Sequence, residues 1–491
     1  MNTGTKARAV AAWLGFALAA LFFYPLAVAL DSDVFYMQWQ RSDTIEAVVA
    51  LALLWVVFAV LVFALWRRAG RTATLLLAAV AAIPLASFLA GLVRQLPFTD
   101  ALVTLGNSPA RIALPLSAGI ALALVVLRSP DAFGRWLRRG LVAISFVALV
   151  VVSSFVRAAS YSAPAVRVHD KTTAAASSST CASVVALLFD ELSFAYLYDE
   201  RGDVRPEYPA FRRLSASSTN YLAVQAPADE TLVSLPGYLA GRHVKRVSVD
   251  EMDLVAVGEE GELEPLALSD PESLFGTARR LGYRTEMAGY YLPYCSLLGD
   301  LVDECRSLSF YNASGVDDGF SPINPMLTTL IMWPRQFPFG IVKDVPFARL
   351  QRGLVEELSA FARLPLTAAQ PVFRFVHFSV PHLPFVFDAD GYNPGLNPLR
   401  TSPDDGYRRQ LRYVDRLVGE LLTDLAGNSS VDRATLVVLA DHGFRFGGLE
   451  KDPLHIPFMV RKAAQTTRAD VTEPQRGELL LPEVVRASCR S

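Results

Sequence analysis

The stretch "ATLVVLADHG", residues 434–443, is a short apolar run that ends abruptly at two polar side chains, Asp441 and His442. A continuous apolar run of this length is typical of a strand that is buried on both faces of a parallel sheet. The run "VVALLF" at 184–189 has the same form and ends at Asp190 and Glu191. In open α/β sheets, ligands bind at the carboxyl ends of the strands. The two runs therefore predict that polar side chains converge at one edge of a sheet.

The segments between and around these runs alternate between helix-like and strand-like patterns. "PESLFGTARRLGYRTEMAGYY" at 271–291 contains a helix-like part, a Gly-Tyr stop and a strand, and "QLRYVDRLVGELLTDLAGN" at 410–428 has apolar residues at helical spacing. "PVFRFVHFSV" at 371–380 and "LHIPFMVR" at 454–461 are strand-like. Helices that alternate with buried strands predict an α/β head with a largely parallel central sheet over residues 181–491.

The first third of the chain is much more apolar than this head. Apolar residues make up 52% of the 491 residues, and the mean hydropathy is +0.31, which is high for a soluble protein. The excess lies in five runs at 9–30, 44–66, 72–93, 110–127 and 140–156. Each run is close to the ~20 residues that cross a bilayer core. We therefore predict a transmembrane domain of five helices over 1–157, followed by a flexible linker over 158–180.

Most Lys and Arg residues of this domain lie at the N-terminus and in the second and fourth loops. Because positive charges stay on the cytoplasmic side, an odd number of spans places the head outside a bacterial inner membrane, on the periplasmic or extracellular side. Cys295 and Cys305 lie close together in "YCSLLGDLVDEC". In an oxidising compartment we expect them to form a disulfide, with two free thiols as the alternative. The net charge of −2 and the lack of basic runs in the head give no support to nucleic-acid binding.

Several residues at the predicted strand ends and segment starts have side chains that bind metals or move protons. They are Asp190, Glu191, Thr231, His382, Asp441, His442 and His455. Carboxylates combined with imidazoles suit Zn²⁺ or Mn²⁺ better than Ca²⁺. Each residue also has a purely structural alternative. A lone histidine is often hydrogen-bonded for structure, and the acid pair and Thr231 are residue types that cap helices. A hydroxyl at a helix N-terminus can also act as a nucleophile when a metal lowers its pKa.

These motifs resemble those of the alkaline phosphatase and sulfatase superfamily. "LLFDELSFAYL" and "ADHG" resemble its metal-binding strand ends, and "HLPFVFD" resembles its substrate-binding segment. In "TLVSLPGYLAGR", Thr231 stands ten residues before Gly241, as the nucleophile does in the superfamily. The T-x-x-S-x-P pattern and five spans before an external head are similar to phosphoethanolamine transferases and lipoteichoic acid synthases, which are membrane-embedded. The acid pair "DE" and the "FRFGG" that follows "ADHG" depart from the pattern of these transferases.

The resemblance implies a metal held by Asp190, Thr231, Asp441 and His442, with Glu191 as additional support. It implies that Thr231 is the nucleophile and that His382 and His455 bind substrate. The cofactor would be one divalent Zn²⁺ or Mn²⁺, with a second ion as the alternative. The expected reaction moves a phosphoethanolamine or phosphoglycerol headgroup from a phospholipid to an envelope glycan or lipid acceptor. The alternatives are a membrane-anchored phosphodiesterase, phosphatase or sulfatase-like hydrolase, and a binding protein without activity.

Overall fold

The computed structural model describes most of the chain, in segments separated by gaps. The described residues are 3–31, 39, 41–67, 71–94, 128–129, 139–160, 166–168, 181–250, 253–257, 263–265, 268, 270–308, 321–332, 340–366, 370–393, 402–426 and 434–489. They form two compact units. The helical unit comprises 1–32, 39–162 and 311–347, and the sheet unit comprises 33–38, 163–310 and 348–491. Residues 321–332, which the sequence placed in the head, thus lie in the helical unit.

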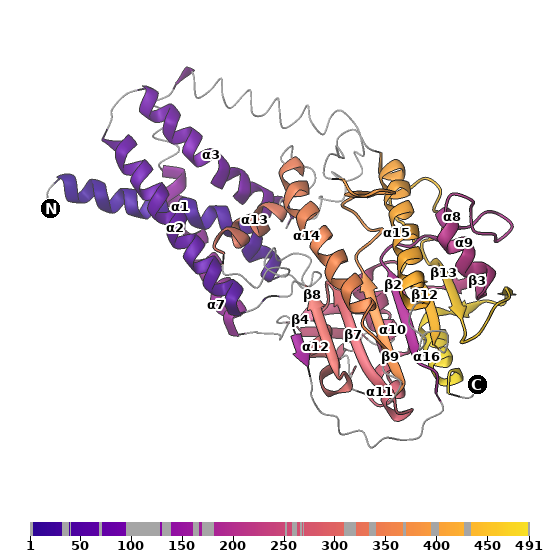
Figure 1. The fold of residues 1–491 in the computed structure, drawn as a ribbon. Coiled ribbons are helices and arrows are strands. Elements are labelled where there is room, and N and C mark those ends of the chain that lie inside the picture. The colour runs from indigo at the N-terminus through magenta and orange to yellow at the C-terminus, as the bar shows by residue number, and fades with distance from the viewer. Residues whose placement is uncertain are drawn as a thin grey trace. The chain divides into compact units, whose positions relative to one another are not determined.

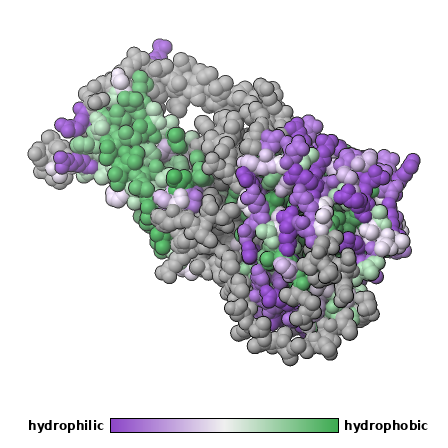
Figure 2. Space-filling view, viewed as in Figure 1, coloured by the Kyte–Doolittle hydropathy of each residue, from purple (hydrophilic) through white to green (hydrophobic). Residues whose placement is uncertain are grey.

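The helical unit is built around α1 (Thr3–Leu30), which packs against α2 (Arg41–Trp66), α3 (Arg71–Arg94) and α7 (Val147–Ser160). The short helix α13 (Ile323–Ile331) packs against α1 and α2. Two stretches are long and apolar enough to cross a membrane, Thr5–Leu30 and Asp43–Leu65. Figure 2 shows hydrophobic residues gathered over these helices, and Val56 and Val60 of α2 are about three-fifths exposed.

Five membrane spans were predicted. Among the described residues, two helices are long and apolar enough to span a membrane. Helix α3 coincides with the third predicted run, and α7, which has 14 residues, overlaps the second half of the fifth run and extends four residues beyond it. The predicted fourth run, 110–127, lies outside the described residues.

The sheet unit contains a ten-stranded sheet (Figure 1). Its order is β1 (Val166–Val168), β8 (Glu304–Leu308), β7 (Arg284–Tyr290), β9 (Val372–Phe378), β2 (Val184–Phe189), β12 (Thr435–Ala440), β13 (His455–Arg461), β3 (Thr219–Gln225) and β14 (Ala469–Val471), and β15 (Gln475–Arg476) pairs with β3. The five strands from β8 to β12 are parallel, whereas β1 and β13 run antiparallel to their neighbours. The largely parallel sheet predicted from the buried runs is therefore confirmed.

Helices cover both faces of this sheet. Helices α10 (Thr231–Ala240), α11 (Leu274–Arg280) and α16 (Gly477–Ala487) pack against one another, and Phe275 of α11 lies against Phe373 and Phe375 of β9. Side chains alternate along a strand, so Arg374 points to the opposite face. There it lies over Phe361 of α14 (Gly340–Ala362). The parallel strands are thus buried on both sides, which explains their continuous apolar runs.

The sheet unit contains several further elements. They are α8 (Phe194–Leu197), α9 (Pro209–Ala216), α12 (Tyr294–Leu298), α15 (Pro403–Ala426), the small sheet β4 (Arg246–Asp250), β5 (Asp253–Val257) and β6 (Leu263–Pro265), and the hairpin β10 (Phe387–Asp388) and β11 (Gly391–Tyr392).

Two disulfides join parts of the sheet unit. Cys295 and Cys305 are bonded, which confirms the predicted local disulfide. The second bond joins Cys181 to Cys489 across a sequence separation of 308 residues. This bond links two segments: the one that precedes β2 and the one that follows α16. No local pattern predicts the pairing of Cys181 with Cys489, because only the strand order brings these two ends together.

Candidate metal centre

The two acid-bearing strand ends lie side by side. Strands β2 and β12 pair in parallel, with Phe189 opposite Ala440, so Asp190 and Asp441 leave the same edge of the sheet. The ligand atoms of Asp190, Asp441 and His442 all lie within 4.8 Å of one another, and all three side chains are buried. His442 Nε2 is 3.5 Å from Asp441 Oδ2 and 3.9 Å from Asp190 Oδ1. The structure thus brings together three residues that the sequence placed at one site.

Thr231 joins this cluster from the first turn of α10. Its Oγ1 donates a hydrogen bond to Asp441 Oδ2 at 2.7 Å and lies 3.3 Å from His442 Nε2. The N-cap position belongs to Glu230, whose side chain makes no capping bond among the described residues. Thr231 is therefore the first helical residue, and its hydroxyl is directed at the acid cluster instead of the backbone of its own helix.

One face of α10 holds the helix against the end of β12. Ser234 Oγ donates to the carbonyl of Asp441 at 2.7 Å, and the Tyr238 hydroxyl donates to the carbonyl of Ala440 at 3.0 Å. Residues three and seven positions after Thr231 lie on the same side of a helix. The spacing of Thr231, Ser234 and Tyr238 therefore fixes the hydroxyl of Thr231 relative to the carboxylate of Asp441.

Hydrogen bonding sets the tautomer of His442. Its Nδ1 lies 2.9 Å from the carbonyl oxygen of Gly443, which accepts a proton but cannot give one. In the neutral form of the ring, this contact places the proton on Nδ1, so that the lone pair of Nε2 faces Thr231 and the two acids. Proteins usually orient a metal-binding histidine in this way, through a hydrogen bond from the ring nitrogen that does not bind the metal.

Burial and charge act differently on the two carboxyl groups. Burial raises the pKa of Asp190 well above its ordinary value, and the nearby charges of Asp441 and Glu191 add to that rise. Burial also opposes ionisation of Asp441, but His442, His377 and the hydrogen bonds from Thr231 and Glu191 outweigh it and lower the pKa of Asp441. Oxygen Oδ1 of Asp190 is buried without a hydrogen-bond partner in the described part of the chain. A cation is the natural partner for these acids.

The donor set fits a divalent metal ion. Asp190 offers an unpartnered oxygen, Asp441 a carboxylate, His442 a lone pair on Nε2 and Thr231 a hydroxyl. Oxygen donors together with one imidazole suit the transition-metal ions that the sequence predicts, Zn²⁺ or Mn²⁺. Which of these ions binds stays a prediction.

Glu191 lies beside the cluster, and its carboxylate pairs with Arg445. Its backbone has a φ of 62°, in the left-handed region, and its N–H donates to Asp441 Oδ1 at 3.0 Å. Its side chain is fully buried, and Oε1 accepts a hydrogen bond from Nε of Arg445 at 3.3 Å. Among the described residues, the group that could hold a metal does not include Glu191. The additional metal support assigned to Glu191 therefore stays a prediction, and its observed partner is Arg445.

His382 lies at the edge of the cluster and is half-buried. Its backbone N–H donates to the carbonyl of Asp190 at 3.2 Å, and its Nδ1 lies 2.6 Å from the carbonyl of Leu383. Gln410 holds this turn by donating to the carbonyls of Pro381 and His382. Burial lowers the pKa of His382, against the opposing charge of Glu191. The turn that carries His382 thus lies beside Asp190.

His455 lies at the same edge of the sheet as the cluster, but its ring contacts Leu222 and Phe194. It opens β13, which runs antiparallel to β12, so it starts where β12 ends. Its Nε2 lies 2.8 Å from the carbonyl of Leu222 in β3, and the ring stacks on Phe194 with centroids 3.9 Å apart. It is absent from the metal-binding group of the described residues. The substrate-binding role of His455 stays a prediction.

His377 is a further residue near the site, and the sequence reasoning missed it. It is fully buried in β9, its Nδ1 lies 2.7 Å from the hydroxyl of Tyr294, and its Nε2 has no partner among the described residues. Burial lowers the pKa of His377 to about 3, although the charge of Asp441 opposes this shift. The available signal was a polar residue inside the otherwise apolar strand "VFRFVHF", of which Arg374 is the other example.

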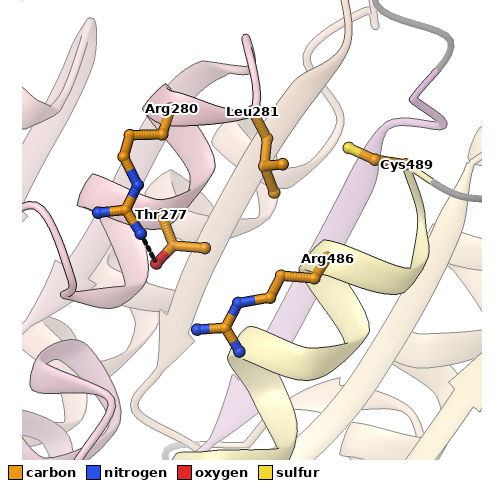
Figure 3. Close-up of a pocket in the computed structure, with 5 residues that line it drawn as sticks. All are labelled: Thr277, Arg280, Leu281, Arg486 and Cys489. Carbon is orange, nitrogen blue, oxygen red and sulfur yellow. Dashed lines mark hydrogen bonds between the residues drawn. The ribbon is translucent and has the colours of Figure 1, made fainter.

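A separate cavity of about 320 Å³ lies away from these residues (Figure 3). Its lining residues are Thr277, Arg280, Leu281, Arg486 and Cys489, at the C-terminal ends of α11 and α16. Arginines at helix C-termini complement the negative end of the helix dipole. This arrangement explains both arginines without a ligand.

Comparisons with solved structures show distant similarity. A protein in the alkaline phosphatase superfamily from Vibrio parahaemolyticus is 13% identical, over 64% of this chain and 68% of that chain, with a TM-score of 0.36. The phosphonate monoester hydrolase of Agrobacterium radiobacter is 13% identical, over 62% and 73%, with a TM-score of 0.39. A sulfatase from a Pseudoalteromonas species is 14% identical, over 63% and 67%, with a TM-score of 0.39.

Comparison with curated proteins gives no match. The sulfatase family model matches residues 182–476, which is more than half of the 491 residues. The matched region contains both acid-bearing strand ends, Thr231 and every other residue of the cluster. The chain therefore belongs to the sulfatase family.

Proposed function

We propose that this protein is a membrane-anchored, metal-dependent phosphotransferase. It moves a phosphoethanolamine or phosphoglycerol headgroup from a phospholipid donor to an envelope glycan or lipid acceptor. The observation that carries the proposal is the position of the Thr231 hydroxyl, 2.7 Å from Asp441 Oδ2 and 3.3 Å from His442 Nε2 at the start of α10. Sulfatase-family members are metal-dependent enzymes, which supports a catalytic role for this cluster.

Asp190, Thr231, Asp441 and His442 would hold one Zn²⁺ or Mn²⁺ ion. Such an ion lowers the pKa of a coordinated hydroxyl and neutralises charge on the group under attack. The N-terminus of α10 adds a positive dipole end where phosphate oxygens would lie. These features together favour an anionic phosphoryl group as the substrate.

In the first step, Thr231 Oγ attacks the phosphorus of the donor. The Oγ–P bond forms while the bond between phosphorus and the diacylglycerol oxygen breaks. The threonine proton leaves along its hydrogen bond to Asp441, and it ends on the diacylglycerol oxygen. The headgroup is then held as a phosphodiester on Thr231.

In the second step, a hydroxyl of the acceptor attacks the same phosphorus and releases Thr231. The Nδ1 of His382 lies 2.6 Å from the Leu383 carbonyl, which orients the ring, and histidine is the most common general base in enzymes. His382 takes the proton of the acceptor hydroxyl, and that proton ends on the oxygen of Thr231. The threonine is thereby restored for the next cycle.

A lipid donor accounts for the helical unit. We infer that five spans anchor the chain, with the head on the periplasmic or extracellular side of a bacterial inner membrane. Two helices of spanning length and composition support the anchoring. Both disulfides, which pair every cysteine of the chain, support an oxidising compartment. No nucleic acid is expected as a partner.

Family membership favours a second candidate, in which water replaces the acceptor. The protein would then be a membrane-anchored phosphodiesterase, phosphatase or sulfatase-like hydrolase with the same residues. Sulfate-ester cleavage by the usual sulfatase route is disfavoured because Thr231 cannot be converted to formylglycine.

Turnover of labelled lipids separates the two candidates. The metal-loaded full-length chain is incubated with phosphatidylethanolamine or phosphatidylglycerol, with and without an envelope extract as acceptor. We expect diacylglycerol release, an adduct on Thr231 in the intact mass, and a product that depends on the acceptor. Release without any acceptor-dependent product contradicts transfer and supports the hydrolase. Neither release nor adduct contradicts both candidates.

A further inference from the structure

We propose that Arg445 is a substrate-contacting residue, whose guanidinium binds the non-bridging oxygens of the phosphoryl group while Glu191 orients it. This inference rests on the proposed function, because it names the residue that recognises the transferred group. It also explains the departure in the sequence, where "FRFGG" follows "ADHG".

Glu191 is buried, and its backbone is held by two hydrogen bonds to side chains of the site. Its φ of 62° is unfavourable for a residue with a Cβ atom, and such backbone strain concentrates at functional sites. Two bonds hold the backbone there: its N–H donates to Asp441 Oδ1 at 3.0 Å, and its carbonyl accepts from the Tyr407 hydroxyl at 2.6 Å. The result is a buried carboxylate beside the metal cluster that faces Arg445.

Arg445 has donors to spare in this position. Of the five N–H groups of a guanidinium, only Nε–H has a hydrogen-bond partner among the described residues, which is Glu191 Oε1 at 3.3 Å. The side chain is 29% exposed, so a ligand can reach part of it. The guanidinium fork matches two oxygens of a tetrahedral anion better than an ammonium group does.

The charges of the site balance only when Arg445 is counted. Three buried carboxylates, Asp190, Glu191 and Asp441, meet at this edge of the sheet. One divalent ion together with Arg445 neutralises all three. Buried charge without compensation is strongly unfavourable, so Arg445 takes the place of a second cation. We therefore expect one metal ion per chain, with the guanidinium as the second positive contact for the phosphoryl oxygens.

A purely structural ion pair is the competing explanation, and phosphate binding separates the two. Inorganic phosphate is titrated calorimetrically into the metal-loaded full-length chain, as wild type, Arg445→Ala and Arg468→Ala. Arg468 is the matched control, because its side chain is 31% exposed and pairs with Asp203 and Asp470 outside the cluster. We expect Arg445→Ala to weaken phosphate binding about 10- to 100-fold, because charge-assisted hydrogen bonds to phosphate are lost. We expect Arg468→Ala to bind phosphate with the affinity of the wild type.

Equal phosphate affinity of Arg445→Ala and wild type at equal metal content overturns the inference, as does a wild type that binds no phosphate. If Arg445→Ala does not load metal, Arg445→Gln keeps a donor for Glu191 without the charge, and the same comparison applies. Loss of metal in both variants assigns Arg445 a structural role and also overturns the inference. Phosphate binding needs no lipid turnover, so it can succeed while the Thr231 adduct fails, or the reverse.

Discussion

Replacing Thr231 with valine exchanges the hydroxyl for a methyl group of nearly the same size. Two effects follow from the contacts of Oγ1. The nucleophile is lost, which we expect to lower turnover by about 10⁴-fold or more. The hydrogen bond to Asp441 Oδ2 is also lost. A hydrogen bond to a charged group contributes about 1.5–3 kcal/mol, so metal affinity should fall roughly 10- to 100-fold.

The assay must separate these two effects. Diacylglycerol release is measured at saturating metal, metal content is measured on the same sample, and intact mass reports the adduct. Thr231→Ser keeps the hydroxyl on a side chain with more rotational freedom, so we expect the adduct to persist at a reduced rate. Ser234→Ala is the control on the same helix face, since it removes a bond to the Asp441 carbonyl and leaves the nucleophile in place. Unchanged release by Thr231→Val at matched metal occupancy would refute the reasoning.

Three further predictions follow from buried groups and the long-range disulfide. Metal affinity should rise with pH above the ordinary carboxyl pKa of 3.8, by up to about tenfold per unit, because burial raises the pKa of Asp190 and the ion must displace its proton; a constant Kd from pH 4 to 8 contradicts this. His377, with its pKa lowered to about 3, stabilises the fold fully above pH 6.5, and this contribution falls by roughly 1.4 kcal/mol per unit as pH drops toward 3. Denaturant unfolding of His377→Asn should therefore depend less on pH between 6.5 and 4 than that of wild type, and equal slopes would exclude the assignment. Replacing Cys181 and Cys489 with serine should lower the unfolding free energy of the sheet unit by up to about 5–6 kcal/mol, from loop closure over 308 residues; a loss below about 1 kcal/mol would show that the bond contributes little.

The residues that the sequence located best are those whose local pattern carries the information. The apolar runs 184–189 and 435–440 became neighbouring parallel strands, so the acids that end them meet at one edge. Thr231 was found through its spacing to Gly241, which ends α10 at a φ of 65°. A helix that starts at Thr231 then aims the hydroxyl at Asp441, because Ser234 and Tyr238 hold the same face of the helix to β12.

His455 shows what a local pattern does not record. The sequence correctly placed it at the start of a strand beside the site. The direction of its ring depends on β3, whose Leu222 carbonyl lies against Nε2, and on Phe194 of α8. Neither neighbour is close to His455 in the sequence, so no local pattern records them.

By itself, the sequence determined the α/β class of the head, the apolar character of the N-terminal third, and the strand ends that carry Asp190, Asp441 and His442. These features depend on hydrophobic periodicity, which burial imposes locally on the chain. Only the tertiary structure decided that 321–332 joins the helical unit, that Cys181 pairs with Cys489, and that Glu191 pairs with Arg445. These contacts join segments far apart in the sequence. Strand order and crossovers determine them, because the same local patterns are compatible with many arrangements of the strands.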